Sequence, residues 1–202
     1  LYTDGYSLFL QKKYKLIYRE IMEYTLLIVP GLGNSGVQHW QTYWLKLFSN
    51  AQKVIQENWD APQLENWLEA LNKKIATIDG PIVLVAHSLG SILVNQWTNT
   101  NFDKKVIAAM LVAPADVDSA THTPPETRNF APIVQNILPF PTVVVTSEDD
   151  PYISFERAKF LAEKWGSTFV NVGLKGHLNT ASDLKNWEEG QEILSALIAE
   201  IN

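Results

Sequence analysis

The serine best placed to do chemistry is Ser88, in the segment V-L-V-A-H-S-L-G at 83–90. An apolar run precedes it and a helical pattern follows, which predicts a sharp turn from a strand into a helix. Such a turn crowds its neighbours, so the positions two before and two after the serine must be small. Ala86 and Gly90 meet this requirement, although the usual pattern is G-x-S-x-G and Ala86 adds one methyl group. The spacing predicts a nucleophile at the carboxyl end of a sheet; the alternative is a serine that only caps the helix.

A serine hydroxyl needs an adjacent base, and the base needs an acid that orients it. The chain has four histidines. His177, in V-G-L-K-G-H-L-N, follows the last predicted strand and suits the chain order Ser…Asp…His, so we choose it as the base. We interpret His87 as structural, because the second position of the turn points its side chain away from the serine. His122 lies in a polar loop and is expected to be solvated, whereas His39 could line the pocket.

The acid should follow a strand between the serine and the histidine. The segment T-V-V-V-T-S-E-D-D-P-Y ends a predicted strand with three acidic residues, Glu148, Asp149 and Asp150. We choose Asp150 because the following proline biases its backbone to an extended conformation. Asp149 is the close competitor, and Asp116, at the end of the preceding strand, is a further candidate.

Acyl transfer also requires N–H donors for the oxyanion. The residue after the nucleophile, Leu89, supplies one. We assign the second to Leu32, in the loop P-G-L-G-N-S-G at 30–36, where glycines let the main chain approach a ligand closely. The same glycines could instead belong to a dinucleotide-binding loop, with Glu57 as the acid expected about 20 residues further on. That alternative gives the serine and the histidine no role.

These side chains need a scaffold that brings strand ends together. From residue 24 onward, apolar runs alternate with helical patterns, and several runs lack alternation, as is typical of strands buried on both faces of a parallel sheet. The order predicts an α/β fold, a three-layer sandwich with a mainly parallel sheet of about six strands flanked by helices. The predicted strands are 24–29, 53–56, 82–85, 106–112, 142–146 and 168–172, and the predicted helices are 37–49, 63–78, 89–98, 155–164 and 187–201.

The connection at 113–141 limits what can cover the site. We expect a helix over 131–138 and a proline-rich loop over 115–130, which is too short for a lid. The site should therefore be open and shallow, with walls from the Gly31–Trp40 loop and from the loop around His177. His39, Trp40 and Trp59 are the candidate pocket residues.

Composition narrows the class of protein. The chain has 202 residues, no cysteine and a net charge of −6, which excludes a disulfide scaffold and disfavours nucleic acid as a partner. Its longest apolar runs, 82–86 and 106–113, are far shorter than the roughly 18 residues that suggest a membrane span. We expect a cytoplasmic domain that acts on a small molecule without a cofactor or metal, and a protein partner remains open.

Residues 1–21 differ from the rest of the chain. They carry four basic and two acidic side chains, which is +2 and leaves −8 for the remainder. We expect a dispensable extension at 1–21 and a single domain at 22–202. The alternative is an amphipathic segment that packs on the domain or on a second chain.

Longer motifs together resemble the α/β-hydrolase superfamily, and within it the small serine hydrolases typified by YdeN and the retinoblastoma-binding protein group. The motifs are I-V-P-G-L-G-N-S-G-V-Q-H-W (28–40), N-W-D-A-P-Q-L-E-N-W (58–67), L-V-A-H-S-L-G-S (84–91), L-V-A-P-A-D-V (111–117), L-P-F-P-T-V-V-V-T-S-E-D-D-P-Y (138–152) and G-H-L-N-T-A-S (176–182). The resemblance implies a minimal fold without a cap domain and a triad of Ser88, Asp150 and His177. The Gly-rich tail that members show after G-H-L-N is absent here at 183–185.

We therefore predict a serine hydrolase that cleaves a small ester, thioester or amide through an acyl-enzyme. The alternative is a catalytically weak protein-interaction module with the same fold.

Overall fold

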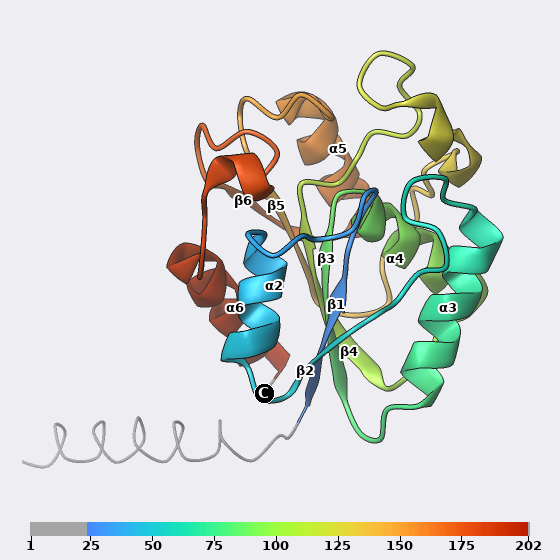
Figure 1. Cartoon of the computed structure of the whole chain (residues 1–202), viewed down its shortest axis with the longest axis vertical. Coiled ribbons are helices and arrows are strands. Elements are labelled where there is room, and N and C mark those ends of the chain that lie inside the picture. Colours follow the sequence, from blue (N-terminus) through green and yellow to red (C-terminus); the bar gives the residue numbers. More distant parts are fainter. Residues whose placement is uncertain (1–23, 202) are drawn as a thin grey trace, which may run out of the picture.

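Six parallel strands form one sheet in the order β2-β1-β3-β4-β5-β6 in the computed structural model (Figure 1). The structure describes residues 24–201, so the expected extension at 1–21 and its boundary lie outside the described residues. The strands are β1 (Thr25–Val29), β2 (Ala51–Lys53), β3 (Ile82–His87), β4 (Val106–Val112), β5 (Thr142–Thr146) and β6 (Thr168–Asn171). The central strand β3 is buried along its whole length, as its unbroken apolar run predicts. The predicted parallel sheet is confirmed.

One strand lies two residues earlier than predicted. The sequence indicates 53–56, but β2 pairs with β1 from Ala51 to Lys53. The side chain of Val54 is buried and its N–H still donates to the carbonyl of Ile28, so the apolar residue that suggested a strand belongs to the core beside the strand's end.

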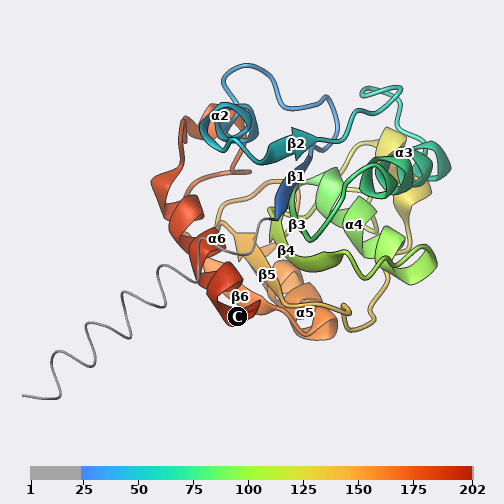
Figure 2. The same ribbon diagram turned by 90° about the horizontal axis from the view of Figure 1, so that it is seen from below.

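Within residues 24–201, five helices cover the two faces of the sheet. They are α2 (Trp40–Leu47), α3 (Leu64–Ala76), α4 (Leu89–Thr100), α5 (Phe155–Trp165) and α6 (Glu188–Ile201). Helices α3, α4 and α5 pack on one face, and α2 and α6 pack on the other, as the turned view in Figure 2 shows. On α3 the buried residues Trp67, Leu71 and Ile75 form one stripe at spacings of four. This is the predicted three-layer sandwich.

The prediction of a helix at 131–138 is wrong. The only regular structure between β4 and β5 is a short 3-10 helix, η1 (Pro125–Phe130), inside the segment predicted to be a loop. The later segment bonds to other elements instead of to itself: the Val134 N–H donates to Asn95 Oδ1, and its carbonyl accepts from Asn95 Nδ2 and Trp165 Nε1. Side chains of α4 and α5 thus satisfy backbone groups that a helix would have paired internally.

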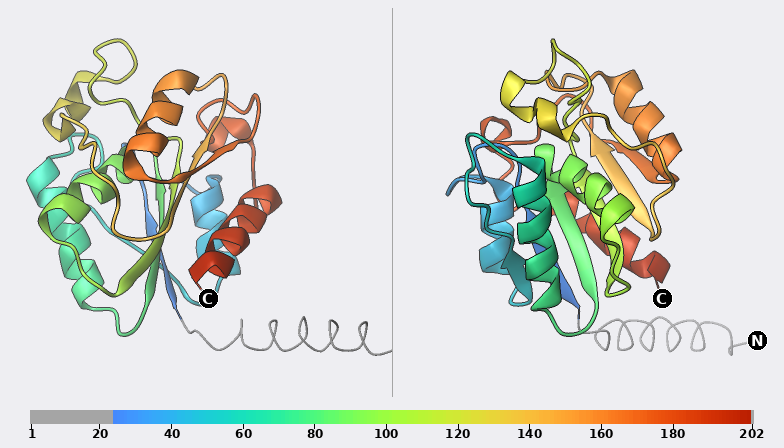
Figure 3. Two further views of the ribbon diagram at one scale, coloured as in Figure 1. Left: turned by 180° about the vertical axis from the view of Figure 1, so that it is seen from behind. Right: turned by 90° about the vertical axis from the view of Figure 1, so that its right-hand side faces the viewer.

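Because all strands are parallel, the loops that follow them meet at one edge, the upper edge of the sheet in Figure 1. Figure 3 shows from two further sides that the β4–β5 connection adds η1 at this edge and that no cap domain is inserted within residues 24–201. In the same range, no helix has the length and apolar character needed to cross a membrane.

Candidate active site

Ser88 occupies a strained turn between β3 and α4. Its φ of 56° and ψ of −124° lie in a region that residues other than glycine rarely adopt, and its N–H donates to the carbonyl of Val112 at 2.9 Å. Two glycines make room for this turn. A Cβ at Gly90 would lie 2.3 Å from the carbonyl oxygen of Val29, and one at Gly31 would lie 2.9 Å from the Cβ of Ser88. Close packing of the β1 loop against the turn therefore requires both glycines.

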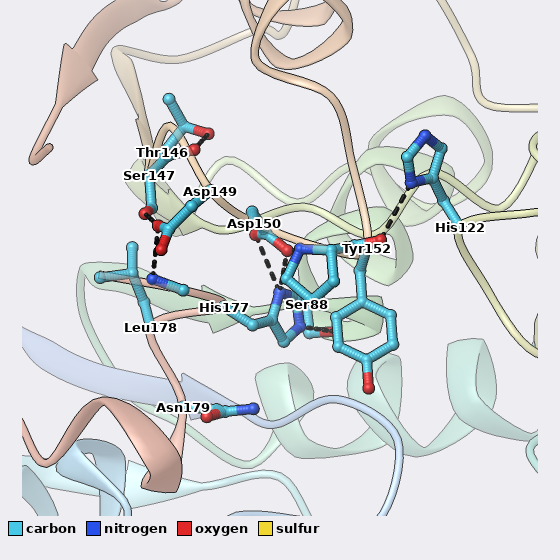
Figure 4. A network of polar contacts seen from close by, with 12 residues as sticks. Ser88, His122, Thr146, Ser147, Asp149, Asp150, Tyr152, His177, Leu178 and Asn179 are labelled. Atoms are coloured by element: carbon cyan, nitrogen blue, oxygen red, sulfur yellow. Dashed lines mark hydrogen bonds and ion pairs between the residues drawn. The ribbon is translucent and has the colours of Figure 1, made fainter. Parts of the chain in front are cut away.

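Three predicted site residues form one hydrogen-bonded chain (Figure 4). The Ser88 hydroxyl donates to Nε2 of His177 at 2.8 Å, and Nδ1 of His177 donates to both carboxylate oxygens of Asp150 at 2.9 Å. The Asp150 side chain is fully buried, and its Oδ1 also accepts the N–H of Tyr152 at 2.8 Å. With Nδ1 donating to the carboxylate, Nε2 carries no proton and can accept one from the serine.

The two competing acids lie elsewhere. Asp149 is exposed, and its Oδ1 accepts from the Ser147 hydroxyl at 2.7 Å and from the Gly176 N–H at 2.8 Å. These bonds lower the pKa of the Asp149 carboxyl and tie it to the loop that carries His177. Asp116 is buried and pairs with Arg157 at 3.4 Å. Of the three candidates, Asp150 is the one that contacts the histidine.

Two further histidines lie beside the hydrogen-bonded residues Ser88, His177 and Asp150. Nε2 of His87 donates to the carbonyl oxygen of His177 at 2.9 Å, and the two rings are 4.9 Å apart between centroids. His39 caps α2 and lies 4.8 Å from the His87 ring. Burial, followed by the proximity of His177 and Lys53, lowers the pKa of His39 to about 4. Burial also lowers the pKa of His87 well below its ordinary value.

His87 thus has the structural contact that its position in the turn suggested, but its ring also lines the cavity. His122, interpreted as solvated, is partly exposed, and its Nδ1 also donates to the carbonyl of Pro151 at 2.9 Å. That bond attaches the β4–β5 connection to the turn after β5.

A cavity of about 560 Å³ opens beside Ser88. Its walls are formed by five segments, which contribute Leu32, Asn34, His39, His87, Leu89, Ala115, Thr123, Pro124, Thr127, Tyr152, His177, Asn179, Thr180 and Ala181. The expected walls, the Gly31–Trp40 loop and the His177 loop, are both present. The expectation was incomplete, because the segment after β4 supplies a further wall.

The structure corrects two of the three pocket candidates. Trp40 is buried below the site and its Nε1 donates to the carbonyl of Leu178 at 2.8 Å, so it supports the histidine loop from the core. Trp59 packs against Trp67 with ring centroids 5.6 Å apart, outside the cavity. His39 does line the cavity.

The two predicted oxyanion donors also lie at the cavity. Leu89 is the first residue of α4, so its N–H has no acceptor within the helix. In the loop after β1, the N–H groups of Gly33 and Asn34 donate to Trp59 and Gly31, and among the described residues the Leu32 N–H makes no such turn bond. Glu57, the acid of the dinucleotide alternative, is exposed and does not line this cavity.

Sequence reasoning missed Asn34 and Asn179, which both line the cavity. A signal was present, since Asn34 lies in the glycine-rich loop and Asn179 follows His177 by two positions. Within residues 24–201, no cluster of three or more His, Asp or Glu side chains could hold a metal ion.

A parallel α/β sheet, a serine on a strained turn after a central strand, and a histidine and acid from later strand ends together define the α/β-hydrolase class. The family model described as serine hydrolase matches residues 26–196, and the chain belongs to this family. It is a hydrolase.

Solved structures agree with this assignment. A protein described as a YdeN-like hydrolase from Pectobacterium atrosepticum is 28% identical, with a TM-score of 0.81, over 94% of this chain and 97% of that one. The ydeN gene product of B. subtilis is similar in fold, with 20% identity, a TM-score of 0.71 and coverage of 88% and 100%. A thermophilic esterase from Thermogutta terrifontis has the same fold at 13% identity, a TM-score of 0.65 and coverage of 89% and 91%. No curated protein sequence matches the chain.

Proposed function

We propose that this hydrolase cleaves a small ester, thioester or amide through an acyl-enzyme on Ser88. The observation that carries the proposal is the hydrogen-bonded chain from Ser88 through His177 to the buried carboxylate of Asp150, at the wall of a cavity. A base in hydrogen-bond contact with the nucleophile, and itself oriented by an acid, is the arrangement that activates a serine hydroxyl.

In the first half of the proposed reaction, Ser88 Oγ attacks the substrate carbonyl carbon while its proton passes to Nε2 of His177. The N–H groups of Leu32 and Leu89 stabilise the negative oxygen of the tetrahedral intermediate. The bond to the leaving group then breaks, and His177 returns the proton to the leaving atom. Asp150 stabilises the imidazolium that exists between these two transfers.

In the second half, His177 takes a proton from water, whose oxygen attacks the acyl carbon. The ester bond to Ser88 breaks, the proton returns to Oγ, and the carboxylic acid leaves. No step requires an oxidant, a reductant or a second substrate besides water.

The test is covalent labelling with a fluorophosphonate probe together with hydrolysis of nitrophenyl butyrate. We expect one adduct, on the peptide that contains Ser88, and loss of both labelling and turnover in Ser88→Ala. The matched control is Ser49→Ala, an exposed serine in the turn after α2, which should keep both. A folded protein that neither reacts with the probe nor hydrolyses any ester would contradict the proposal and favour an interaction module.

A further inference from the structure

Two walls of the cavity, the loop after β1 and the loop around His177, present N–H donors whose orientation is fixed by the backbone. Oδ1 of Asn34 accepts the N–H of Ser35 at 2.7 Å, and Oδ1 of Asn179 accepts the N–H of Ala181 at 2.9 Å. Each bond occupies the amide oxygen, so the amide NH₂ is the group left for another partner. Both asparagines line the cavity, and Figure 4 shows Asn179 near His177.

His39, on the loop after β1, adds a third donor. Its Nδ1 accepts the N–H of Gln41 at 3.2 Å, so the proton of the neutral ring is on Nε2. The ring remains neutral at pH 7, because burial has lowered its pKa to about 4. The neighbouring His87 adds no donor, since its own N–H is directed at the carbonyl of His177.

The loop that carries Asn34 and His39 is held in place by buried contacts. Nε2 of Gln41 donates to the carbonyls of Val29 and Val85, and its Oε1 accepts from the hydroxyl of Ser35. These bonds attach the loop to the ends of β1 and β3. A wall fixed in this way loses little freedom when a ligand binds.

The wall formed by the segment after β4 has a different chemistry. The hydroxyl of Thr123 donates to the carbonyl of Asp116 at 3.1 Å, and that of Thr127 donates to the carbonyl of Pro124 at 2.8 Å. With these protons engaged, and with Ala115 and Pro124 beside them, this wall offers mainly apolar surface. The hydroxyls of Tyr152 and Thr180 can both donate and accept a hydrogen bond, so they favour neither a donor nor an acceptor group on the substrate.

No Lys, Arg, Asp or Glu side chain among the described residues lines the cavity. A carboxylate or phosphate on the substrate would find no cation there, and an ammonium group would find no surface anion. Burying an unpaired charge is costly, so this lining disfavours charged substrates.

We propose that Asn34, His39 and Asn179 form a specificity subsite that binds a neutral acceptor oxygen, an ether or carbonyl oxygen, close to the bond that is cleaved. This inference rests on the proposed function and narrows its substrate class. The substrates are uncharged esters or amides that carry a further ether or carbonyl oxygen near the cleaved bond and an apolar portion that faces the Ala115 and Pro124 wall.

The test compares matched substrates that differ by one CH₂-to-O exchange. Nitrophenyl methoxyacetate and nitrophenyl butyrate place the exchange in the acyl group, and 2-methoxyethyl butyrate and butyl butyrate place it in the alcohol. The ratio of kcat/KM within each pair is measured for the wild type and the variants, so that the intrinsic reactivity of each ester cancels.

The variants are Asn34→Asp and Asn179→Asp, which keep the oxygen that accepts the backbone N–H, and His39→Ser, which keeps a capping oxygen. In at least one pair, each should reduce the preference for the ether by about threefold to tenfold, the usual value of one neutral hydrogen bond. The two Asp variants should also shift selectivity from 3,3-dimethylbutyl butyrate toward butyrylcholine, which has the same shape and a positive charge. Asn99→Asp, on the exposed end of α4, is the control and should change no ratio.

Two failures are distinguishable. If the wild type hydrolyses the esters but all three subsite variants match Asn99→Asp in every ratio, the subsite is refuted and the proposed function stands. If the wild type reacts with the fluorophosphonate probe but hydrolyses none of these esters, the subsite alone is refuted. If it neither reacts with the probe nor hydrolyses an ester, both are refuted. Thermal unfolding of each variant identifies any that has lost its fold, and the remaining variants then decide.

Discussion

At Ser88 the backbone bears the strain that makes the side chain accessible. A residue other than glycine in this region of φ and ψ costs on the order of 1–3 kcal/mol, which the surroundings must supply. Here they do so through the hydrogen bond to Val112, and through helix α4, which begins at the next residue. The roles of the acids are likewise set by contacts, since Asp149 and Asp150 are adjacent but Asp149 binds loop N–H groups and Asp150 binds the histidine.

We predict that Asp150→Asn reduces turnover by about 10⁴, because an amide would favour the wrong tautomer of His177. Asp149→Asn and Asp116→Asn should cost far less, since neither residue contacts the histidine. Steady-state kinetics with nitrophenyl butyrate measures all three. A different ranking would show that the acid assignment is wrong.

At the scale of elements, the loop after β1 and the start of α4 are packed together more tightly than side chains would allow. Gly90 lies against the carbonyl oxygens of Val29 and Pro30, and Gly31 lies against the turn at Ser88. The oxyanion donors proposed on Leu32 and Leu89 come from these two segments. Their separation therefore depends on both glycines.

Gly31→Ala should lower kcat by about 10²-fold, because a Cβ there would lie 2.9 Å from the Cβ of Ser88 and 3.0 Å from the Leu89 nitrogen. The matched control is Gly36→Ala in the same loop, where a Cβ meets nothing within 4 Å. Kinetics and thermal unfolding of both variants test this. Equal activity in the two would mean that the loop can move away without cost.

At the scale of the whole molecule, two buried neutral histidines link stability to pH. The ordinary pKa of histidine is 6.5, whereas that of His39 in the folded protein is about 4 and that of His87 is also lowered. Between these pH values the unfolded chain binds protons that the folded chain does not. The free energy of unfolding therefore falls as the pH falls through this window.

We expect His39→Ser to lose less stability than the wild type between pH 7 and pH 4.5. The difference should approach about 3 kcal/mol at most, because one pKa unit corresponds to roughly 1.4 kcal/mol. Urea unfolding at both pH values measures it. The two proteins would lose equal stability if the pKa of His39 were the same in the folded and the unfolded protein.

The open position of the cavity limits how much of an acyl chain is buried. The cavity lies at the loop edge of the sheet, and no cap domain covers it within residues 24–201, so each added methylene should gain less than the ~0.8 kcal/mol of full burial. We predict hydrolysis of nitrophenyl acetate and butyrate, a decline with chain length, and no rate increase with emulsified substrate. A preference for chains longer than about ten carbons would require a tunnel or a lid.

The expected extension at 1–21 is tested by its removal. A chain that begins at Met22 should keep its Tm and its esterase rate within error, because the first core strand starts at Thr25. A fall in Tm of more than about 5 °C would mean that the segment packs on the domain.

Much of the fold and of the candidate site could be predicted from local patterns in the sequence. The alternation of apolar runs and helical stripes predicted the parallel sheet, because strands buried on both faces need continuous apolar residues. The turn around Ser88 could be recognised because its small neighbours are a local steric requirement. His177 and Asp150 followed from chain order, since in a parallel sheet the carboxyl ends of all strands meet at one edge.

Only the tertiary structure decided what depends on partners distant in the chain. The segment 131–138 reads as a helix, but Asn95 and Trp165 satisfy its backbone at Val134, and no local pattern records those side chains. Trp40 and Trp59 follow strand ends as pocket residues would, yet Trp40 lies in the core and Trp59 packs against it, because large apolar area is better buried there. The orientations of His39, Asn34 and Asn179 depend on how their loops fold back on themselves. A sequence specifies which donors and acceptors exist, and the three-dimensional packing determines which of them are left free to face a substrate.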